Sequence, residues 1–145
     1  MAKRPFVIFA EDDHEDWNLI QDALDECHPN DTPTWERCVD GVALLDRLRD
    51  GTRPIPDLIM LDLRMPRMDG AEALDAIRSD TALKHIPVVV LTTSKSEADI
   101  FMSYHKGANS YVVKPVSYDA IKETLHAVKH YWTTVVRVPK TEAVK

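Results

Sequence analysis

The chain alternates between short apolar runs and stretches in which apolar residues recur at helical spacing. The runs are Phe6–Ala10, Leu58–Leu61, Val88–Leu91 and Tyr111–Val113, with 34–39 as a weaker, edge-like strand. Continuous apolar runs of this length are typical of strands that are buried on both faces. Because strands that alternate with helices form parallel sheets covered on both sides, we predict a doubly wound α/β fold with five strands and five helices.

The predicted helices lie between these strands. Apolar spacing and glycine or proline breaks place them over 16–27, 41–48 and 71–77. A fourth helix is predicted to begin at Ser96, with Asp99 at the position of a capping acid, and to end at Gly107. A fifth begins near Ser117, and Pro29 and Pro33 interrupt the chain before the second strand.

Composition limits the function classes. A chain of 145 residues with 44% hydrophobic content forms one domain around one core, and its net charge of -6 disfavours unaided binding to nucleic acid or anionic lipid. No apolar run approaches the ~20 residues that a membrane span requires, and the first residues do not resemble a signal peptide. The two cysteines, Cys27 and Cys38, have no metal or redox spacing, so we expect reduced thiols in a cytoplasmic protein.

Polar residues stand at the carboxyl end of four predicted strands. Glu11 and Asp12 follow the first strand, Asp62 the third, Thr92 ends the fourth and Lys114 follows the fifth. In open parallel sheets these ends meet at one edge, where ligands bind. We therefore expect these side chains to lie together.

Clustered carboxylates repel one another unless a cation relieves them. Oxygen ligands without His or Cys favour magnesium, and Lys114 and Thr92 would then donate to phosphate oxygens. Three further acids, Asp13, Glu15 and Asp16, fall in the first turn of the next helix. There the helix dipole alone favours acids, so we assign those three no role in the site.

Four segments of the chain resemble the receiver domain of two-component response regulators. They are Val7–Asp13, Asp57–Gly70, Ile86–Ser94 and Gly107–Pro115, in the same order and at matching intervals. The resemblance spans residues 5 to about 131 and implies a flavodoxin-like (βα)5 fold in three layers.

The resemblance implies that Asp62 is the phosphoacceptor, a nucleophile toward the phosphohistidine of a histidine kinase. It also implies that Glu11, Asp12 and Asp62 hold Mg²⁺ together with the backbone carbonyl of Arg64. Glu11 stands where many family members have Asp, and its longer side chain still reaches a metal-bound water.

Two further roles follow from the same resemblance. Thr92 and Lys114 would bind phosphoryl oxygens, and Tyr111 would turn inward as the switch aromatic when Thr92 moves. Thr93 is bulkier than the usual family residue, which predicts slow loss of the phosphoryl group. Arg64 and Ser94 flank the site and either tune this rate or face solvent.

Trp17 lies at core spacing with Ile20 and Leu24, which predicts a core residue. The alternative is a docking contact for the kinase, because this end of the first helix faces partners in the family.

The tail after residue 131 is apolar and aromatic. We divide the chain into a receiver, 1–131, and a C-terminal extension, 132–145, with the last helix giving way to extended chain near Thr133. We predict a homodimer interface anchored by Tyr131, Trp132 and Val136. The alternative is a tail folded over its own last helix. The ending also resembles single-domain regulators associated with bacterial phytochrome histidine kinases.

The sequence thus predicts a cytoplasmic, single-domain response regulator that is not an enzyme. Its length leaves no room for a DNA-binding output domain, so a partner protein or a phosphorelay would carry the signal. A dehalogenase-type phosphatase is disfavoured, because Arg64 stands where its second acid belongs. A receiver-like interaction module that takes no phosphate remains the alternative.

Overall fold

The computed structural model describes residues 5–27 and 34–139 of the chain. Its strands form one parallel sheet in the order β2-β1-β3-β4-β5. The strands are β1 (Phe6–Ala10), β2 (Thr34–Cys38), β3 (Leu58–Leu61), β4 (Val88–Thr92) and β5 (Ser110–Val113). The predicted five-stranded, doubly wound parallel sheet is confirmed.

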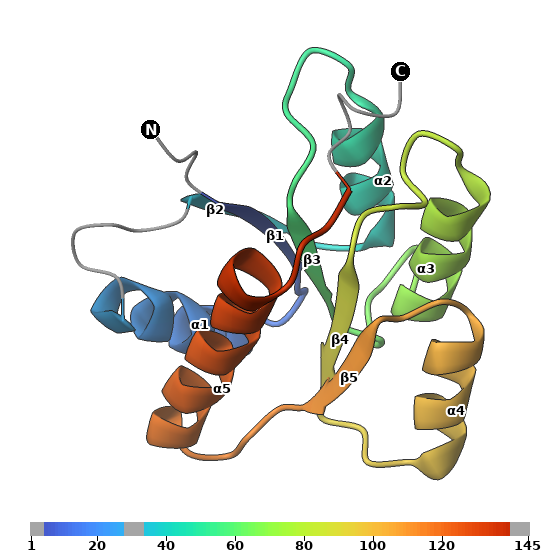
Figure 1. Ribbon diagram of the computed structural model, residues 1–145. Coiled ribbons are helices and arrows are strands. Elements are labelled where there is room, and N and C mark those ends of the chain that lie inside the picture. Colours follow the sequence, from blue (N-terminus) through green and yellow to red (C-terminus); the bar gives the residue numbers. More distant parts are fainter. Residues whose placement is uncertain (1–4, 28–33, 140–145) are drawn as a thin grey trace.

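Helices cover both faces of this sheet, in three layers (Figure 1). They are α1 (His14–Cys27), α2 (Gly41–Arg49), α3 (Gly70–Ser79), α4 (Glu97–His105), α5 (Tyr118–His130) and a final π-helical turn, η1 (Tyr131–Val135). α1 and α5 pack on one face, and α2, α3 and α4 lie on the other. Pro29 and Pro33 lie outside the described residues.

Two helix starts follow from local side-chain caps. α1 begins at His14 rather than at residue 16, because Asp13 Oδ1 accepts a hydrogen bond from the amide of Asp16 at 2.9 Å. α4 begins where predicted, since the Ser96 side chain accepts from the amide of Asp99.

Alternate residues of each central strand supply the two halves of the core. Val7 and Phe9 of β1 pack toward α1 and α5, whereas Ile8 and Ala10 pack toward α2 and α3. This period of two is the geometry of a strand, and it explains why every position of β1 and β3 is apolar. Trp17 packs in the half of the core formed with α1 and α5, where it is 8% exposed. The predicted core position of Trp17 is therefore confirmed.

The chain after α5 stays helical for longer than predicted. η1 continues to Val135, where the amide of Val136 donates to the carbonyl of Tyr131 at 3.0 Å, and the change to extended backbone comes at Val136 rather than near Thr133. The hydroxyl group of Thr133 donates to the carbonyl of Lys129, four residues earlier, at 2.6 Å, a bond that a threonine can form inside a helix. No helix within residues 5–27 and 34–139 is long and apolar enough to cross a membrane.

Candidate functional site

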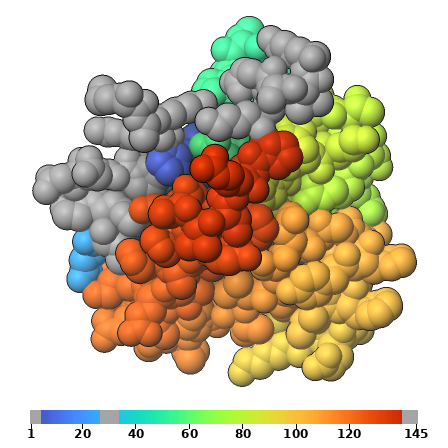
Figure 2. Space-filling model, viewed as in Figure 1, coloured from blue at the N-terminus to red at the C-terminus, as the bar shows by residue number. Residues whose placement is uncertain are grey.

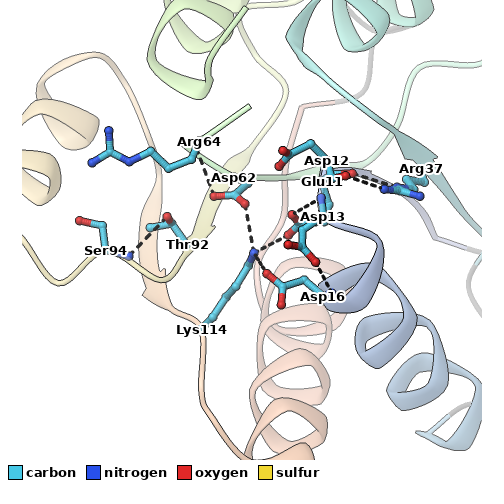
Figure 3. A network of polar contacts seen from close by, with 10 residues as sticks. All are labelled: Glu11, Asp12, Asp13, Asp16, Arg37, Asp62, Arg64, Thr92, Ser94 and Lys114. Atoms are coloured by element: carbon cyan, nitrogen blue, oxygen red, sulfur yellow. Dashed lines mark hydrogen bonds and ion pairs between the residues drawn. The ribbon is translucent and has the colours of Figure 1, made fainter. Parts of the chain in front are cut away.

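The strand ends bring the predicted polar residues to one edge of the sheet. Backbone hydrogen bonds continue the parallel pairing just past the strands: Glu11 N donates to Cys38 O at 3.0 Å and Asp62 N to Ala10 O at 3.1 Å. Lys114 N likewise donates to Thr92 O at 2.7 Å. These bonds align neighbouring loops, so that the five side chains predicted to converge do so (Figure 3).

Three carboxylates form a candidate metal centre. Ligand oxygens of Glu11, Asp12 and Asp62 all lie within 4.8 Å of one another. Glu11 and Asp62 are 2% and 7% exposed, while Asp12 is the more accessible of the three. An all-oxygen donor set that is partly open to water fits Mg²⁺, which retains several waters when it binds to protein.

The ammonium group of Lys114 lies among the acids. Its Nζ is 2.5 Å from Glu11 Oε1 and 3.0 Å from Asp62 Oδ2. A third carboxylate, Asp16 Oδ2, lies 2.8 Å from the same nitrogen. The prediction that Asp16 has no role beyond the helix dipole is therefore wrong. Asp16 lies four residues after Asp12, and this spacing, close to one helical turn, was the available signal.

The electrostatics of the cluster favour a bound cation. Burial and then the negative charge of Asp62 raise the pKa of Glu11 to about 7. Burial alone would lower the pKa of Lys114, but hydrogen bonds to Asp16 and Glu11 and the charge of Asp62 outweigh it, so this pKa is raised. One ammonium group therefore stays charged but does not fully relieve the crowded acids, and a divalent ion would do so.

The loop between β3 and α3 holds Asp62 closely. The amide of Arg64 donates to Asp62 Oδ1 at 3.3 Å. The amide of Gly70 donates to Leu63 O at 3.0 Å, and a Cβ atom at Gly70 would overlap the carbonyl of Asp62. A glycine is therefore required at the start of α3 for the loop to pack against the backbone of Asp62.

The Arg64 side chain connects this loop to α4. Although it is 73% exposed, it lies 2.9 Å from Asp99 Oδ2, and the same oxygen accepts from Ser94 Oγ at 2.5 Å. Arg64 and Ser94 are therefore linked through Asp99, although the Arg64 side chain still faces solvent. The sequence predicts Asp99 as a capping acid, but its carboxylate forms these two contacts instead.

Thr92 and Tyr111 lie on the β4–β5 side of the site. Thr92 is fully buried, and its Oγ1 accepts from the amide of Ser94 at 3.5 Å. Tyr111 is half-buried, and its hydroxyl group donates to the carbonyl of Ser94 at 2.9 Å. Both predicted switch residues thus contact the same loop residue.

A family model for the response regulator receiver domain matches residues 7–126. The chain belongs to this family. The match covers every residue of the site described above, and it is consistent with the four sequence segments that suggested the resemblance.

Two curated proteins illustrate which receiver domains this one is similar to. The probable methanogenesis regulatory protein FilR2 of Methanothrix harundinacea is 40% identical over 95% of this chain and 90% of its own. Response regulator Rcp1 of Synechocystis is 33% identical over 92% of both chains. This chain thus spans nearly the full length of both relatives.

Solved structures place this receiver domain beside phytochrome response regulators. The phosphorylated cyanobacterial phytochrome response regulator RcpA superposes with a TM-score of 0.89 at 34% identity, over 95% of this chain and all of its own. The Mn²⁺-bound form of Rcp1 superposes with a TM-score of 0.83 at 32% identity, over 94% of this chain and 99% of its own. The family, the flavodoxin-like fold and the likeness to phytochrome regulators are therefore confirmed.

Proposed function

We propose that this receiver domain accepts a phosphoryl group from a histidine kinase onto Asp62. One observation carries this assignment. The partly buried ammonium group of Lys114 lies next to Asp62 and a second carboxylate, that of Glu11, at the edge of the sheet. A nucleophilic carboxylate must approach a negatively charged phosphoryl group, and the site supplies a fixed positive charge for that approach.

In the proposed step, an Asp62 carboxylate oxygen forms a bond to phosphorus as the phosphorus–nitrogen bond of the phosphohistidine breaks. The electron pair of that bond stays on the imidazole nitrogen, and because the other ring nitrogen already carries a proton, the histidine leaves as a neutral ring. Lys114 already lies 3.0 Å from Asp62 Oδ2, so a small movement lets it pair with a phosphoryl oxygen.

The same proposal assigns Mg²⁺ to Glu11, Asp12 and Asp62, with the backbone carbonyl of Arg64 as a further ligand. The ion would neutralise charge on the transferred group. Three carboxylates within 4.8 Å support this assignment, and the Mn²⁺-bound form of Rcp1 provides a divalent precedent in a relative.

Phosphorylation would be sensed through the loop after β4. The new phosphoryl oxygens accept a hydrogen bond from the hydroxyl group of Thr92, which draws this loop toward Asp62. Tyr111 bonds to the carbonyl of Ser94 in the same loop, so a shift of the loop moves the aromatic ring. This coupling supports Thr92 and Tyr111 as the switch pair.

We further propose that the domain works in the cytoplasm as a signalling module rather than as an enzyme, and that it binds neither nucleic acid nor membranes. Its partner would be a histidine kinase of the phytochrome type, a choice supported by the likeness to Rcp1 and RcpA. Phosphotransfer from a purified, autophosphorylated phytochrome kinase tests this pairing, and a kinase with an unrelated sensor serves as the comparison.

We also propose a homodimer through the extension after residue 131. Tyr131 is 48% exposed and contacts the ring of Trp132 edge-on, with ring centroids 5.4 Å apart, while Val136 is half-buried. Trp132 packs against the α1/α5 core, so it would brace the interface from behind. η1 lies at the surface of the molecule beside the end of α5 (Figure 2).

Light scattering at several concentrations, with and without phosphorylation, measures the mass of the assembly. A dimer that Tyr131→Ser converts to a monomer supports the interface, and a monomer under every condition rejects it. Residues 140–145 of the extension lie outside the described residues.

Intact mass after incubation with acetyl phosphate and magnesium tests the central proposal. We expect one added phosphoryl group, which is absent from Asp62→Asn and from a chelator-treated sample. If neither mass nor beryllofluoride binding reports an occupied site, the proposal fails and the phosphate-independent interaction module takes its place.

A further inference from the structure

Arg37 on β2 binds the backbone of the segment that carries the metal-site acids. Its Nε donates to the carbonyl of Glu11 at 2.8 Å, and its Nη2 donates to the carbonyl of Asp12 at 3.2 Å. Two adjacent carbonyls are thus held by one planar guanidinium group. Figure 3 shows that Arg37 approaches this segment from the side away from Asp62.

The guanidinium group is itself fixed by the start of α1. Its Nη1 lies 3.0 Å from Nδ1 of His14, and its central carbon lies 5.8 Å from the centre of the Trp17 ring. A cation above an aromatic face is attracted to it, and Trp17 is part of the core. Arg37 is therefore anchored at both ends, by the sheet on which it sits and by the helix it contacts.

The contacts leave Glu11 little backbone freedom. Its amide donates to the carbonyl of Cys38 at 3.0 Å, and its own carbonyl accepts from Arg37. Both backbone polar groups of Glu11 are therefore bonded to adjacent residues of β2. The crowded carboxylates push the Glu11–Asp12 segment away from Asp62, and these bonds oppose that movement.

We propose that Arg37 is a positioning residue for the Mg²⁺ site, which holds the backbone of Glu11 and Asp12 so that their carboxylates face Asp62. The inference rests on the proposed function, because it concerns the same metal. Mg²⁺ demands a near-ideal arrangement of its ligands, so a displaced Asp12 lowers affinity more than it lowers stability. Lysine cannot replace this residue fully, because a single ammonium group lacks the planar fork that spans two carbonyls.

Calorimetric titration with Mg²⁺ alone tests the proposal on three full-length variants. We expect Arg37→Met to raise the dissociation constant for Mg²⁺ about tenfold, the lower end of the range for residues that orient metal ligands. Arg37→Lys is expected to give an intermediate value. Arg53→Met is the matched control. Arg53 forms an exposed ion pair with Glu36, which lies on β2 next to Arg37, and in the structure described it has no contact with Glu11, Asp12 or Asp62.

Two further readouts separate positioning from general stability. At saturating Mg²⁺, the phosphorylation rate of Arg37→Met with acetyl phosphate is expected to return close to wild type. Without metal, the amide protons of Asp12 and Asp13 are expected to exchange faster in Arg37→Lys than in wild type, while those of β3 are unchanged. Arg37→Lys keeps the charge, so it carries the test if Arg37→Met does not fold.

Mg²⁺ affinities of both Arg37 variants within twofold of wild type overturn the inference, even when phosphorylation proceeds normally. Equal losses of Mg²⁺ affinity in Arg37→Met and Arg53→Met also overturn the inference, because each variant then responds only to the loss of one positive charge. A wild-type protein that neither binds Mg²⁺ nor takes a phosphoryl group rejects the proposed function itself, and the inference with it.

Discussion

The ammonium group of Lys114, just after β5, lies 2.8 Å from a carboxylate oxygen of Asp16 in the first turn of α1. Asp16 thereby ties the lysine to α1. We predict that Asp16→Asn slows phosphorylation by acetyl phosphate about fivefold, because a partly exposed charge-assisted bond contributes about 1 kcal/mol to the placement of the ammonium group. The initial rate at saturating Mg²⁺ is the measurement.

Glu15→Gln is the matched control for this prediction. It removes one negative charge from the same helical turn, on an exposed side chain. Equal rates for the two variants would show that Asp16 acts only through the net charge near the site.

Glu11 should make the stability of the metal-free protein depend on pH. Its pKa is raised to about 7 from 4.5, mainly by burial and then by Asp62. Between these values the folded state binds more protons than the unfolded state, so the free energy of unfolding falls as pH rises through the window. We expect Glu11→Gln to exceed wild type in melting temperature at pH 8 and to lose this advantage near pH 4.5.

Added Mg²⁺ provides the internal check on the role of Glu11. The ion stabilises the ionised carboxylate, so it should raise the melting temperature of wild type more at pH 8 than at pH 5. If Glu11→Gln exceeds wild type in melting temperature by the same amount at pH 4.5 and at pH 8, Glu11 is not the group that causes the pH dependence.

Thr93 is exposed, and it lines an apolar cavity of about 190 Å³ together with Lys114 and Leu91. Thr93 follows Thr92 at the end of β4, and we expect its β-branched side chain to narrow the approach of water to a phosphoryl group on Asp62. We predict that Thr93→Ala shortens the phosphoryl lifetime at least about threefold, a change of about 0.7 kcal/mol in the barrier. Loss of phosphoprotein after removal of the donor gives the rate.

Thr93→Val preserves the branched shape and should keep the slow rate. If the alanine and valine variants both lose the phosphoryl group faster than wild type, and at the same rate, the hydroxyl group rather than the shape of Thr93 sets the lifetime.

Arg78, on α3, holds the opposite end of the sheet from the phosphoryl site. It donates to the carbonyls of Lys84, Ile86 and Gly107 and to the Asn109 side chain, at 2.8 to 2.9 Å. We predict that Arg78→Met lowers the free energy of unfolding by about 2–4 kcal/mol, since several partly buried acceptors lose their donor. Urea denaturation measures this change.

The phosphorylation rate of the folded Arg78→Met variant should match wild type, because Arg78 has no contact with the site in the part of the chain described. Arg49→Met removes an exposed ion pair to Asp80 and should change stability by less than about 1 kcal/mol. A phosphorylation defect in the Arg78 variant at a temperature where it is folded would contradict a purely structural role.

Much of the site was visible in the sequence because strand ends are predictable. Glu11, Asp12 and Asp62 follow apolar runs, and parallel strands end at one edge, so their convergence required only the strand order of an open sheet. Asp16, Arg37 and Asp99 were missed for a different reason. Each projects from a helical turn or an edge strand, where charged residues are common without any function.

The sequence by itself determined the fold class, the residues that meet at the sheet edge and the apolar period that divides the core into two halves. These features depend on local pattern, which repeats along each strand and helix. The tertiary structure alone decided that Asp16 binds Lys114, that Arg37 holds the carbonyls of the acid segment, and that the last helix continues into η1. The contacts of Asp16 and Arg37 join residues far apart in the chain, and their geometry is set by the packing of whole elements rather than by the residues nearby.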